Sequence, residues 1–265
     1  MRDYRNLLNI LIEATRIMYD AIWDEYNRVS KTNVTLSEIA NRVDNASASA
    51  LENYLEEIDF KPRVISEEGF KTYNPKEDVI LIVDPIDGTT NFVRGIPFSS
   101  ISLALSRGNS INDIFIGVIK DIFRGDLFHA IKGMGSFLNN TRIHVSKVKS
   151  TAEAYISICI NRAKPGRSSE LNILPLIPYA RHFGSAALEG AYVACGKIDL
   201  HVDVRGALRV FDIAASQLLV KEAGGKVLVW QNRSTNVDIF KIHGISIIEA
   251  CSPHLLERAM DFIKI

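Results

Sequence analysis

The chain carries, at residues 79–92, the stretch VILIVDPIDGTTNF. Its first five residues form an unbroken apolar run of strand length, which predicts a β-strand buried on both faces. This strand delivers two carboxylates, Asp84 and Asp87, at its carboxyl end, where the ligand sites of open α/β sheets lie. Pro85 stiffens the bend that follows, because its ring fixes φ and removes a donor. The stretch therefore predicts a central strand with a functional site at its end.

The turn after this strand has the composition of a phosphate and metal site. Gly88 permits close backbone approach, and the amides of Gly88, Thr89 and Thr90 are expected to point outward together. Carboxylate oxygens beside such amides are the ligands that Mg²⁺ prefers. The alternative is an Asx-rich turn in which Asp84 and Asp87 only cap backbone groups. The attached glycine and threonines, together with the buried strand, favour the site.

Composition places the chain among ordinary soluble globular proteins. Its 265 residues correspond to roughly one or two domains of about 150 residues. The 31 basic residues balance the 31 acidic ones, and 47% of the residues are hydrophobic, which excludes an intrinsically disordered chain. Without a basic excess or an apolar run of about 18 residues, we expect neither nucleic acid nor membrane as a partner. The N-terminal sequence lacks the pattern of a signal peptide. Three isolated cysteines, Cys159, Cys195 and Cys251, fit a reduced, cytoplasmic protein.

Hydrophobic periodicity predicts helices first, then strands, then an alternation of both. Apolar residues at three- and four-residue spacings predict helices over residues 7–29 and 46–58. Alternation in the second half is typical of layered α and β structure. We therefore expect an N-terminal α+β sub-domain at residues 1–150 and a C-terminal α/β sub-domain at 151–265, in one compact catalytic unit. Further strands are expected near 63–66, 99–106, 113–121, 126–130, 154–160, 179–183, 198–202 and 226–230, a loop at 163–170, and helices at 185–195 and 212–222.

Three separated stretches of the chain resemble motifs of one enzyme family. The stretch at 79–92 resembles the metal motif of the inositol monophosphatase superfamily, the lithium-sensitive, Mg²⁺-dependent phosphatases. Upstream, ISEEG at 65–69 is similar to the strand-end glutamate motif of that family, with Glu67 in the metal position. Downstream, VFDIAA at 210–215 resembles its second motif, with Asp212 as the acidic residue. The metal motif at 79–92 and the second motif at 210–215 stand in the order that the family has.

The resemblance extends over most of the chain. Asp44, in NRVD at 41–44, resembles the aspartate that assists the water-bearing metal, and KEAGG at 221–225 follows the second motif. The family implies a fold of the α+β or α/β class, a layered αβαβα sandwich, and a homodimer. The apolar stretch at 173–177 could supply the dimer interface, although a buried core is the commoner use of such a stretch.

The resemblance implies a role for each matching residue. Thr89 would orient or deprotonate the attacking water, with Asp44 and Glu67 assisting, and no phosphoenzyme would form. The backbone of Gly88 and Thr89 would hold the phosphate. Two or three Mg²⁺ ions would be bound, with one carboxylate bridging two of them, and the implied ligands are Glu67, Asp84 (the bridge), Asp87, Asp212 and the carbonyl of Ile86.

Each acidic residue outside the central turn also has a purely structural interpretation. Glu67 could be a solvated charge after a strand, and Asp212 could be the N-cap of the helix that it begins. Asp44 stands just before a predicted helix and could face water. Their joint occurrence with the turn at 84–90 favours the functional interpretation, most clearly for Glu67 and Asp212.

The second half of the chain contains candidate substrate-binding residues. FGSAA at 183–187 resembles the substrate-side helix start of the family, with Ser185 and Ala186 lining the site, although small residues also permit tight helix packing. Asp203 could bind inositol hydroxyls, as an acidic group does in the inositol-selective animal enzymes. Arg181 and Arg205 are interpreted as binding a second phosphate, because guanidinium groups match phosphate better than a neutral polyol.

The segments DVR at 203–205 and LRVFD at 208–212 resemble the archaeal branch of the superfamily. Enzymes of that branch hydrolyse both inositol-1-phosphate and fructose-1,6-bisphosphate. Arg167 and Arg209 are interpreted as surface charges or members of local salt bridges. Two departures stand out: residues 31–37 match the lysine-rich loop of the family poorly, and Phe211 replaces the usual tryptophan. Both leave the metal carboxylates intact.

These observations predict a Mg²⁺-dependent phosphomonoesterase acting on inositol-1-phosphate and fructose-1,6-bisphosphate. A nucleotide 3′-phosphatase of the same superfamily is an alternative, although Thr90 stands where those relatives carry Lys or Arg. Phosphatases of the haloacid dehalogenase type have their aspartates two residues apart, whereas Asp84 and Asp87 are three apart. A non-catalytic sugar-phosphate-binding module would be favoured by the loss of a metal carboxylate, and all four are present.

Overall fold

The computed structural model of the chain describes residues 3–67, 69–72, 78–159 and 179–263, and at 69–72 its backbone only. The predicted loop at 163–170, Arg167 and the apolar stretch at 173–177 lie outside the described residues.

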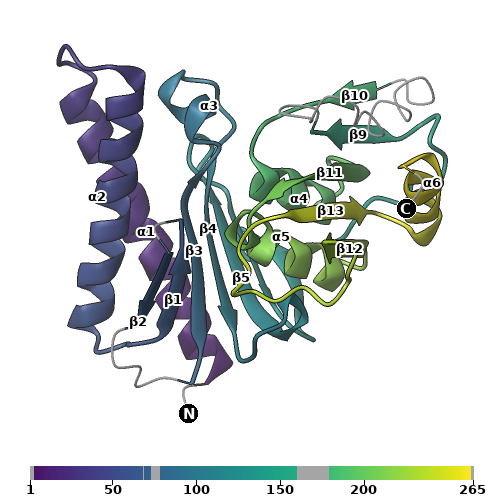
Figure 1. Cartoon of the computed structure of the whole chain (residues 1–265), viewed down its shortest axis with the longest axis horizontal. Coiled ribbons are helices and arrows are strands. Elements are labelled where there is room, and N and C mark those ends of the chain that lie inside the picture. The colour runs from purple at the N-terminus through teal and green to yellow at the C-terminus, as the bar shows by residue number, and fades with distance from the viewer. Residues whose placement is uncertain (1–2, 68, 73–77, 160–178, 264–265) are drawn as a thin grey trace.

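The described elements stack as five layers in the order helices, sheet, helices, sheet, helix (Figure 1). A long helical pair forms the first layer, and two further helices lie between the sheets. This is the predicted αβαβα sandwich. The helices are α1 (Tyr4–Val29) and α2 (Leu36–Glu57) in the first layer, α4 (Ala186–Ala194) and α5 (Val210–Glu222) between the sheets, and α6 (Pro253–Ile263) in the last layer. The short helix α3 (Thr89–Val93) follows β3 and contacts α2.

The first sheet has eight strands in the order β2-β1-β3-β4-β5-β6-β7-β8. Strand β3 pairs in parallel with β1 and antiparallel with β4, so it lies inside the sheet, as its apolar run predicts. The short strands at 69–72, 135–138 and 141–143 were not predicted. The strands are β1 (Arg63–Ser66), β2 (Gly69–Thr72), β3 (Ile80–Asp87), β4 (Ser100–Ser106), β5 (Ile114–Asp121), β6 (Leu127–Ile131), β7 (Gly135–Leu138) and β8 (Thr141–Ile143), with a 3₁₀ turn at Ile111–Asp113.

The second sheet has five strands in the order β10-β9-β11-β13-β12. Strand β9 pairs in parallel with β10 and β11, and β13 pairs antiparallel with β11 and β12. The expected division of the chain at residue 150 stays a prediction, and it falls in the connection between the two sheets. The strands are β9 (Tyr155–Ile158), β10 (Tyr179–Arg181), β11 (Leu200–Leu208), β12 (Lys226–Gln231) and β13 (Ile245–Ala250).

Three apolar cores hold the layers together. The first lies between α1, α2 and the outer face of the first sheet, with Met18 and Ile22 fully buried. The second fills the space between the two sheets around α4 and α5, and the third joins the second sheet to α6. Helix α5 is buried along nearly its whole length, because it packs against both sheets. Its first turn is therefore held in a fixed place relative to β3.

Helix α2 begins ten residues before the predicted helix, at Leu36. A capping box starts it there: Thr35 accepts a hydrogen bond from the backbone N–H of Glu38, and the Glu38 carboxylate accepts from Thr35. The expectation that Asp44 precedes the helix is therefore wrong, because Asp44 lies in the third turn. Leu36, Ile39 and Val43 have the three- and four-residue spacing of a helix, so the apolar pattern begins before the predicted start at residue 46.

No helix among the described residues is both long enough and apolar enough to cross a membrane.

Candidate metal and phosphate site

An irregular pairing at the end of β3 brings two carboxylates to one side of the sheet. Asp84 lies opposite Ser102 of β4 and Asp87 lies opposite Ser100, so one extra residue stands in β3 between these two pairs. Residues three apart in a regular strand point to opposite faces, whereas the extra residue turns both carboxylates the same way. Pro85 lies within this irregularity, where its missing N–H is tolerated inside a sheet.

The third carboxylate comes from the first turn of α5. The Asp212 carboxylate accepts a hydrogen bond of 2.7 Å from the backbone N–H of Arg209, in a capping-box arrangement. Asp212 is therefore both a helix-capping residue and a member of an acidic cluster. The side chains of Asp84, Asp87 and Asp212 offer oxygens within 4.8 Å of one another, and the three residues are 1%, 8% and 6% exposed.

Burial and mutual repulsion disfavour the ionised forms of these carboxyl groups. Burial raises the pKa of Asp84 well above its ordinary value, and the nearby Asp87 and Asp212 raise it further. Burial, with the charge of Asp212, raises the pKa of Asp87 to about 7. Oxygen Oδ2 of Asp84 is buried and has no hydrogen-bond partner. Converging carboxylates with an unpartnered oxygen fit a divalent cation with oxygen ligands, which would supply the missing positive charge.

Asp87 is held from the other side by the start of α4. Its Oδ2 accepts hydrogen bonds from the Ser185 hydroxyl at 2.6 Å and from the Ala187 backbone N–H at 2.7 Å. Gly88 makes this approach possible: its φ is +87°, and a Cβ there would lie 3.0 Å from the carbonyl oxygen of Gly184. The end of β3 and the start of α4 therefore meet at this carboxylate.

Arg209 links the two outer acidic residues of the site. Its guanidinium donates to Asp212 from Nη2 at 3.0 Å and from Nε at 3.2 Å, and its Nη1 donates to Glu67 at the end of β1. The predicted local salt bridge is present, but it also spans to Glu67, 142 residues away in sequence. Sequence reasoning missed the pairing of Arg209 with Glu67, because the sequence shows only that Arg209 stands three residues before Asp212. The neighbouring carboxylates raise the pKa of Arg209 further above its ordinary value, despite the opposing effect of its burial.

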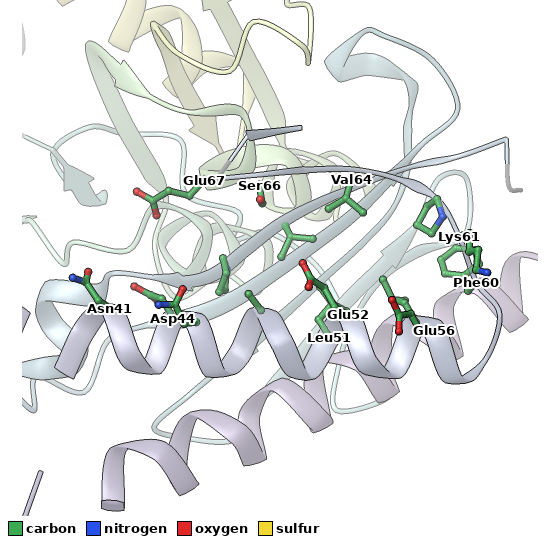
Figure 2. Close-up of a pocket in the computed structure, with 16 residues that line it drawn as sticks. Asn41, Asp44, Leu51, Glu52, Glu56, Phe60, Lys61, Val64, Ser66 and Glu67 are labelled. Atoms are coloured by element: carbon green, nitrogen blue, oxygen red, sulfur yellow. The ribbon is translucent and has the colours of Figure 1, made fainter. Parts of the chain in front are cut away.

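Glu67 and Asp44 face a cavity of about 690 Å³ between α2 and strands β1 and β3. Figure 2 shows both at the same end of this cavity, with Phe60 and Lys61 at the other end. Asp84, Asp87 and Asp212 do not line it, so the cavity borders the site on the side of Glu67 only. Thr89, at the first position of α3, donates from its hydroxyl to the carbonyl oxygen of Ile86 at 2.8 Å.

The predicted substrate residues lie at three places: the start of α4, strand β11 and strand β10. Ser185 and Ala186 begin α4 beside Asp87. Asp203 is 1% exposed and accepts from Arg205 with both oxygens, at 2.9 Å from Nε, so it orients that guanidinium. Arg181 lies on the exposed strand β10, where Nη1 donates to the carbonyl of Ala180.

Comparisons with known proteins agree on one family. The sequence matches the inositol monophosphatase family over residues 3–259. A fructose-1,6-bisphosphatase/inositol-1-monophosphatase of Methanothermobacter thermautotrophicus is 36% identical over 214 residues, 76% of this chain and 75% of that protein. The Nus factor SuhB of Pasteurella multocida is 31% identical over 229 residues, 83% of this chain and 84% of that protein. The crystal structure of the extragenic suppressor protein SuhB of Bartonella henselae has a TM-score of 0.81 at 30% identity and covers 98% of each chain. The chain therefore belongs to the inositol monophosphatase family.

Proposed function

We propose that the chain is a Mg²⁺-dependent phosphatase that hydrolyses inositol-1-phosphate and fructose-1,6-bisphosphate. One observation carries the metal dependence: Asp84, Asp87 and Asp212 converge while buried, and Oδ2 of Asp84 has no partner. The substrate assignment is supported by the archaeal relative that bears both activities in its name.

Two or three Mg²⁺ ions are proposed at this site. When bound, they would neutralise phosphate charge, lower the pKa of water and stabilise the leaving oxygen. The charges of Asp87, Asp212 and Glu67 all act on Asp84, which supports its role as the bridging ligand. Arg209 donates hydrogen bonds to both Glu67 and Asp212, so we propose that it competes with the metal for these carboxylates. The proposed ligands are Glu67, Asp84, Asp87, Asp212 and the carbonyl of Ile86.

We assign Thr89 to the orientation of the attacking water. Because its hydroxyl proton is donated to the Ile86 carbonyl, its oxygen lone pairs stay available to accept a hydrogen bond from water. Glu67 and Asp44, on the cavity side, are proposed to assist in removing the proton. The positive φ of Gly88 turns the backbone there, and we propose that the amides of Gly88 and Thr89 hold the phosphate.

The remainder of the substrate is proposed to lie beside the start of α4. Ser185 and Ala186 are small residues, which leaves room for a polyol or sugar near Asp87. Arg205, fixed by Asp203, is proposed to bind a second phosphate, and Arg181 to assist it. A role of Asp203 in binding inositol hydroxyls stays a prediction, and it would require Arg205 to release one of its oxygens.

A phosphate-release assay tests the proposal. Purified protein is incubated with inositol-1-phosphate, fructose-1,6-bisphosphate or phosphoadenosine phosphate, with Mg²⁺ or with EDTA. We expect turnover of the first two substrates with Mg²⁺ only. Turnover of phosphoadenosine phosphate alone would support the nucleotide phosphatase instead. Binding that raises the melting temperature without any phosphate release would support a non-catalytic sugar-phosphate-binding module.

We also propose a cytoplasmic homodimer. All three cysteines are free thiols in the structure, which supports a reducing compartment. Light scattering coupled to gel filtration measures the mass in solution, and a mass close to the 29.5 kDa of one chain would contradict the dimer.

A further inference from the structure

A second cluster of charged side chains lies buried behind the start of α4. His201 of β11 stands between Glu249 of β13 and Glu189 of α4. Its Nδ1 lies 2.9 Å from Oε2 of Glu249, and its Nε2 lies 3.5 Å from Oε2 of Glu189. None of the three residues is more than 2% exposed. The side chains of this cluster are therefore shielded from solvent.

The imidazole of this cluster is held as a cation. Burial alone would lower the pKa of His201, but the charges of Glu189 and Glu249 and the hydrogen bond with Glu249 raise it to about 9. Asp203, on the same strand, adds to this effect. Buried ion pairs contribute little stability compared with apolar residues of the same shape, whereas they fix the orientation of their members. The cluster is therefore better explained by what it orients.

Glu189 connects the cluster to the turn that holds Asp87. Its Oε1 accepts a hydrogen bond of 3.1 Å from the backbone N–H of Phe183 and another from the hydroxyl of Ser157. Two residues further on, Ser185 donates to the Asp87 carboxylate. The turn between them needs such a restraint, because Gly184 has a φ of +89° and adds no side chain of its own.

The glycine at position 190 lets α4 approach the cluster closely. A Cβ at Gly190 would lie 2.5 Å and 2.7 Å from the two carboxylate oxygens of Glu249. A glycine inside a helix is less favourable than an alanine. Gly190 therefore replaces a better helix former at the point where α4 contacts the buried charge.

We propose that Glu189, His201 and Glu249 are positioning residues for the metal site, acting through the Phe183–Ser185 turn on Asp87. The His201 ring lies 3.5 Å from Oε2 of Glu189 and holds that carboxylate in place. Glu189 then fixes the turn, and the turn fixes the carboxylate. This inference rests on the proposed role of Asp87 as a metal ligand.

The test compares Glu189→Gln with a matched variant, Glu222→Gln. The Glu222 carboxylate likewise accepts two hydrogen bonds, from the backbone N–H groups of Gly133 and Gly135, but at the far end of α5. Mg²⁺ binding is measured by calorimetry on the purified protein, and the Mg²⁺ dependence of turnover separates KM for Mg²⁺ from kcat. We expect Glu189→Gln to weaken Mg²⁺ binding about tenfold, the lower end of the effect of residues that orient metal ligands. Glu222→Gln should leave Mg²⁺ binding unchanged.

Two further variants make every outcome informative. Ser157→Ala removes one hydrogen bond to Glu189 with little other change, so it replaces Glu189→Gln if that variant does not fold, and we expect about threefold weaker Mg²⁺ binding. Asp87→Asn shows whether Asp87 is a ligand at all. If Asp87→Asn abolishes Mg²⁺ binding while Glu189→Gln and Ser157→Ala bind like the unaltered protein, the positioning role is refuted. If Asp87→Asn leaves binding unchanged, the proposed metal site itself is wrong.

Discussion

Replacement of Arg209 by methionine tests the electrostatic balance of the site. Without a bound cation, the Arg209 guanidinium partly neutralises the charge of Asp212 through hydrogen bonds of 3.0 and 3.2 Å, and it also donates to Glu67. A hydrogen bond to a charged group contributes about 1.5–3 kcal/mol. Because the Glu67 side chain is 58% exposed, solvent screens its part to below about 1 kcal/mol. Arg209→Met should therefore destabilise the protein in EDTA by about 2 kcal/mol.

Bound Mg²⁺ should reverse most of this loss. The guanidinium competes with Mg²⁺ for Glu67 and Asp212, so its removal should make Mg²⁺ binding about tenfold tighter, which corresponds to about 1.4 kcal/mol. The melting temperature of Arg209→Met should then lie below that of the unaltered protein by about 4–8 °C in EDTA and by about 1–3 °C in saturating Mg²⁺.

Arg124→Met is the matched control, because it removes the same charge from an arginine that pairs with Asp126, a residue outside the metal site. It should change neither the Mg²⁺ affinity nor the effect of Mg²⁺ on unfolding. Weaker Mg²⁺ binding by Arg209→Met would refute the reasoning, since Arg209 would then support the ligands rather than compete for them.

Three further predictions concern the acidic cluster, the glycine turn and the buried imidazole. Asp84→Asn should lower the turnover rate roughly a thousandfold in a phosphate-release assay, because the bound metal would no longer stabilise the transition state as well. The same change should not lower the melting temperature in EDTA, because it removes one of the converging negative charges. Gly88→Ala should cost about 1–3 kcal/mol in urea unfolding, and more than Gly95→Ala, which shares the positive φ but has no atom within 4 Å of the added Cβ. The pKa of His201 is raised to about 9, so its stabilising contribution should be complete below about pH 6.5 and lost as the pH rises through 9. His201→Phe should therefore be more destabilising, relative to the unaltered protein, at pH 6 than at pH 10, and an equal difference at both would contradict a buried cation.

Local sequence patterns predicted the elements that form the site. The apolar run at 79–83 is strand β3, because a strand covered on both faces needs apolar residues at every position. The helix after Asp212 and the small-residue helix after Ser185 were predicted within a few residues of their bounds. These elements carry their signal in consecutive residues. The αβαβα arrangement of layers came from the family resemblance, since spacing alone does not say which sheet faces which.

Contacts between distant segments were beyond the sequence. Nothing in the pattern around Arg209 indicates Glu67, and nothing around His201 indicates Glu249, 48 residues later. Such pairs exist because the folded backbone brings two strand ends or two neighbouring strands together. The irregularity between Asp84 and Asp87 has the same origin, since it depends on the register with β4. Sequence reasoning could name the carboxylates of the site, but not the groups that hold them.

The formal charge of zero conceals two buried clusters with opposite needs. At the first, three buried carboxylates of β3 and α5 face one guanidinium that is 28% exposed and is shared with Glu67. The positive charge is insufficient there, and Asp84 keeps an unpartnered oxygen. At the second, the imidazole of His201 lies 2.9 Å from a carboxylate oxygen of Glu249 and 3.5 Å from one of Glu189. The first cluster therefore fits a cation from solution, as proposed above, whereas the second contains its own basic group, His201. This difference separates the proposed binding role from the proposed positioning role.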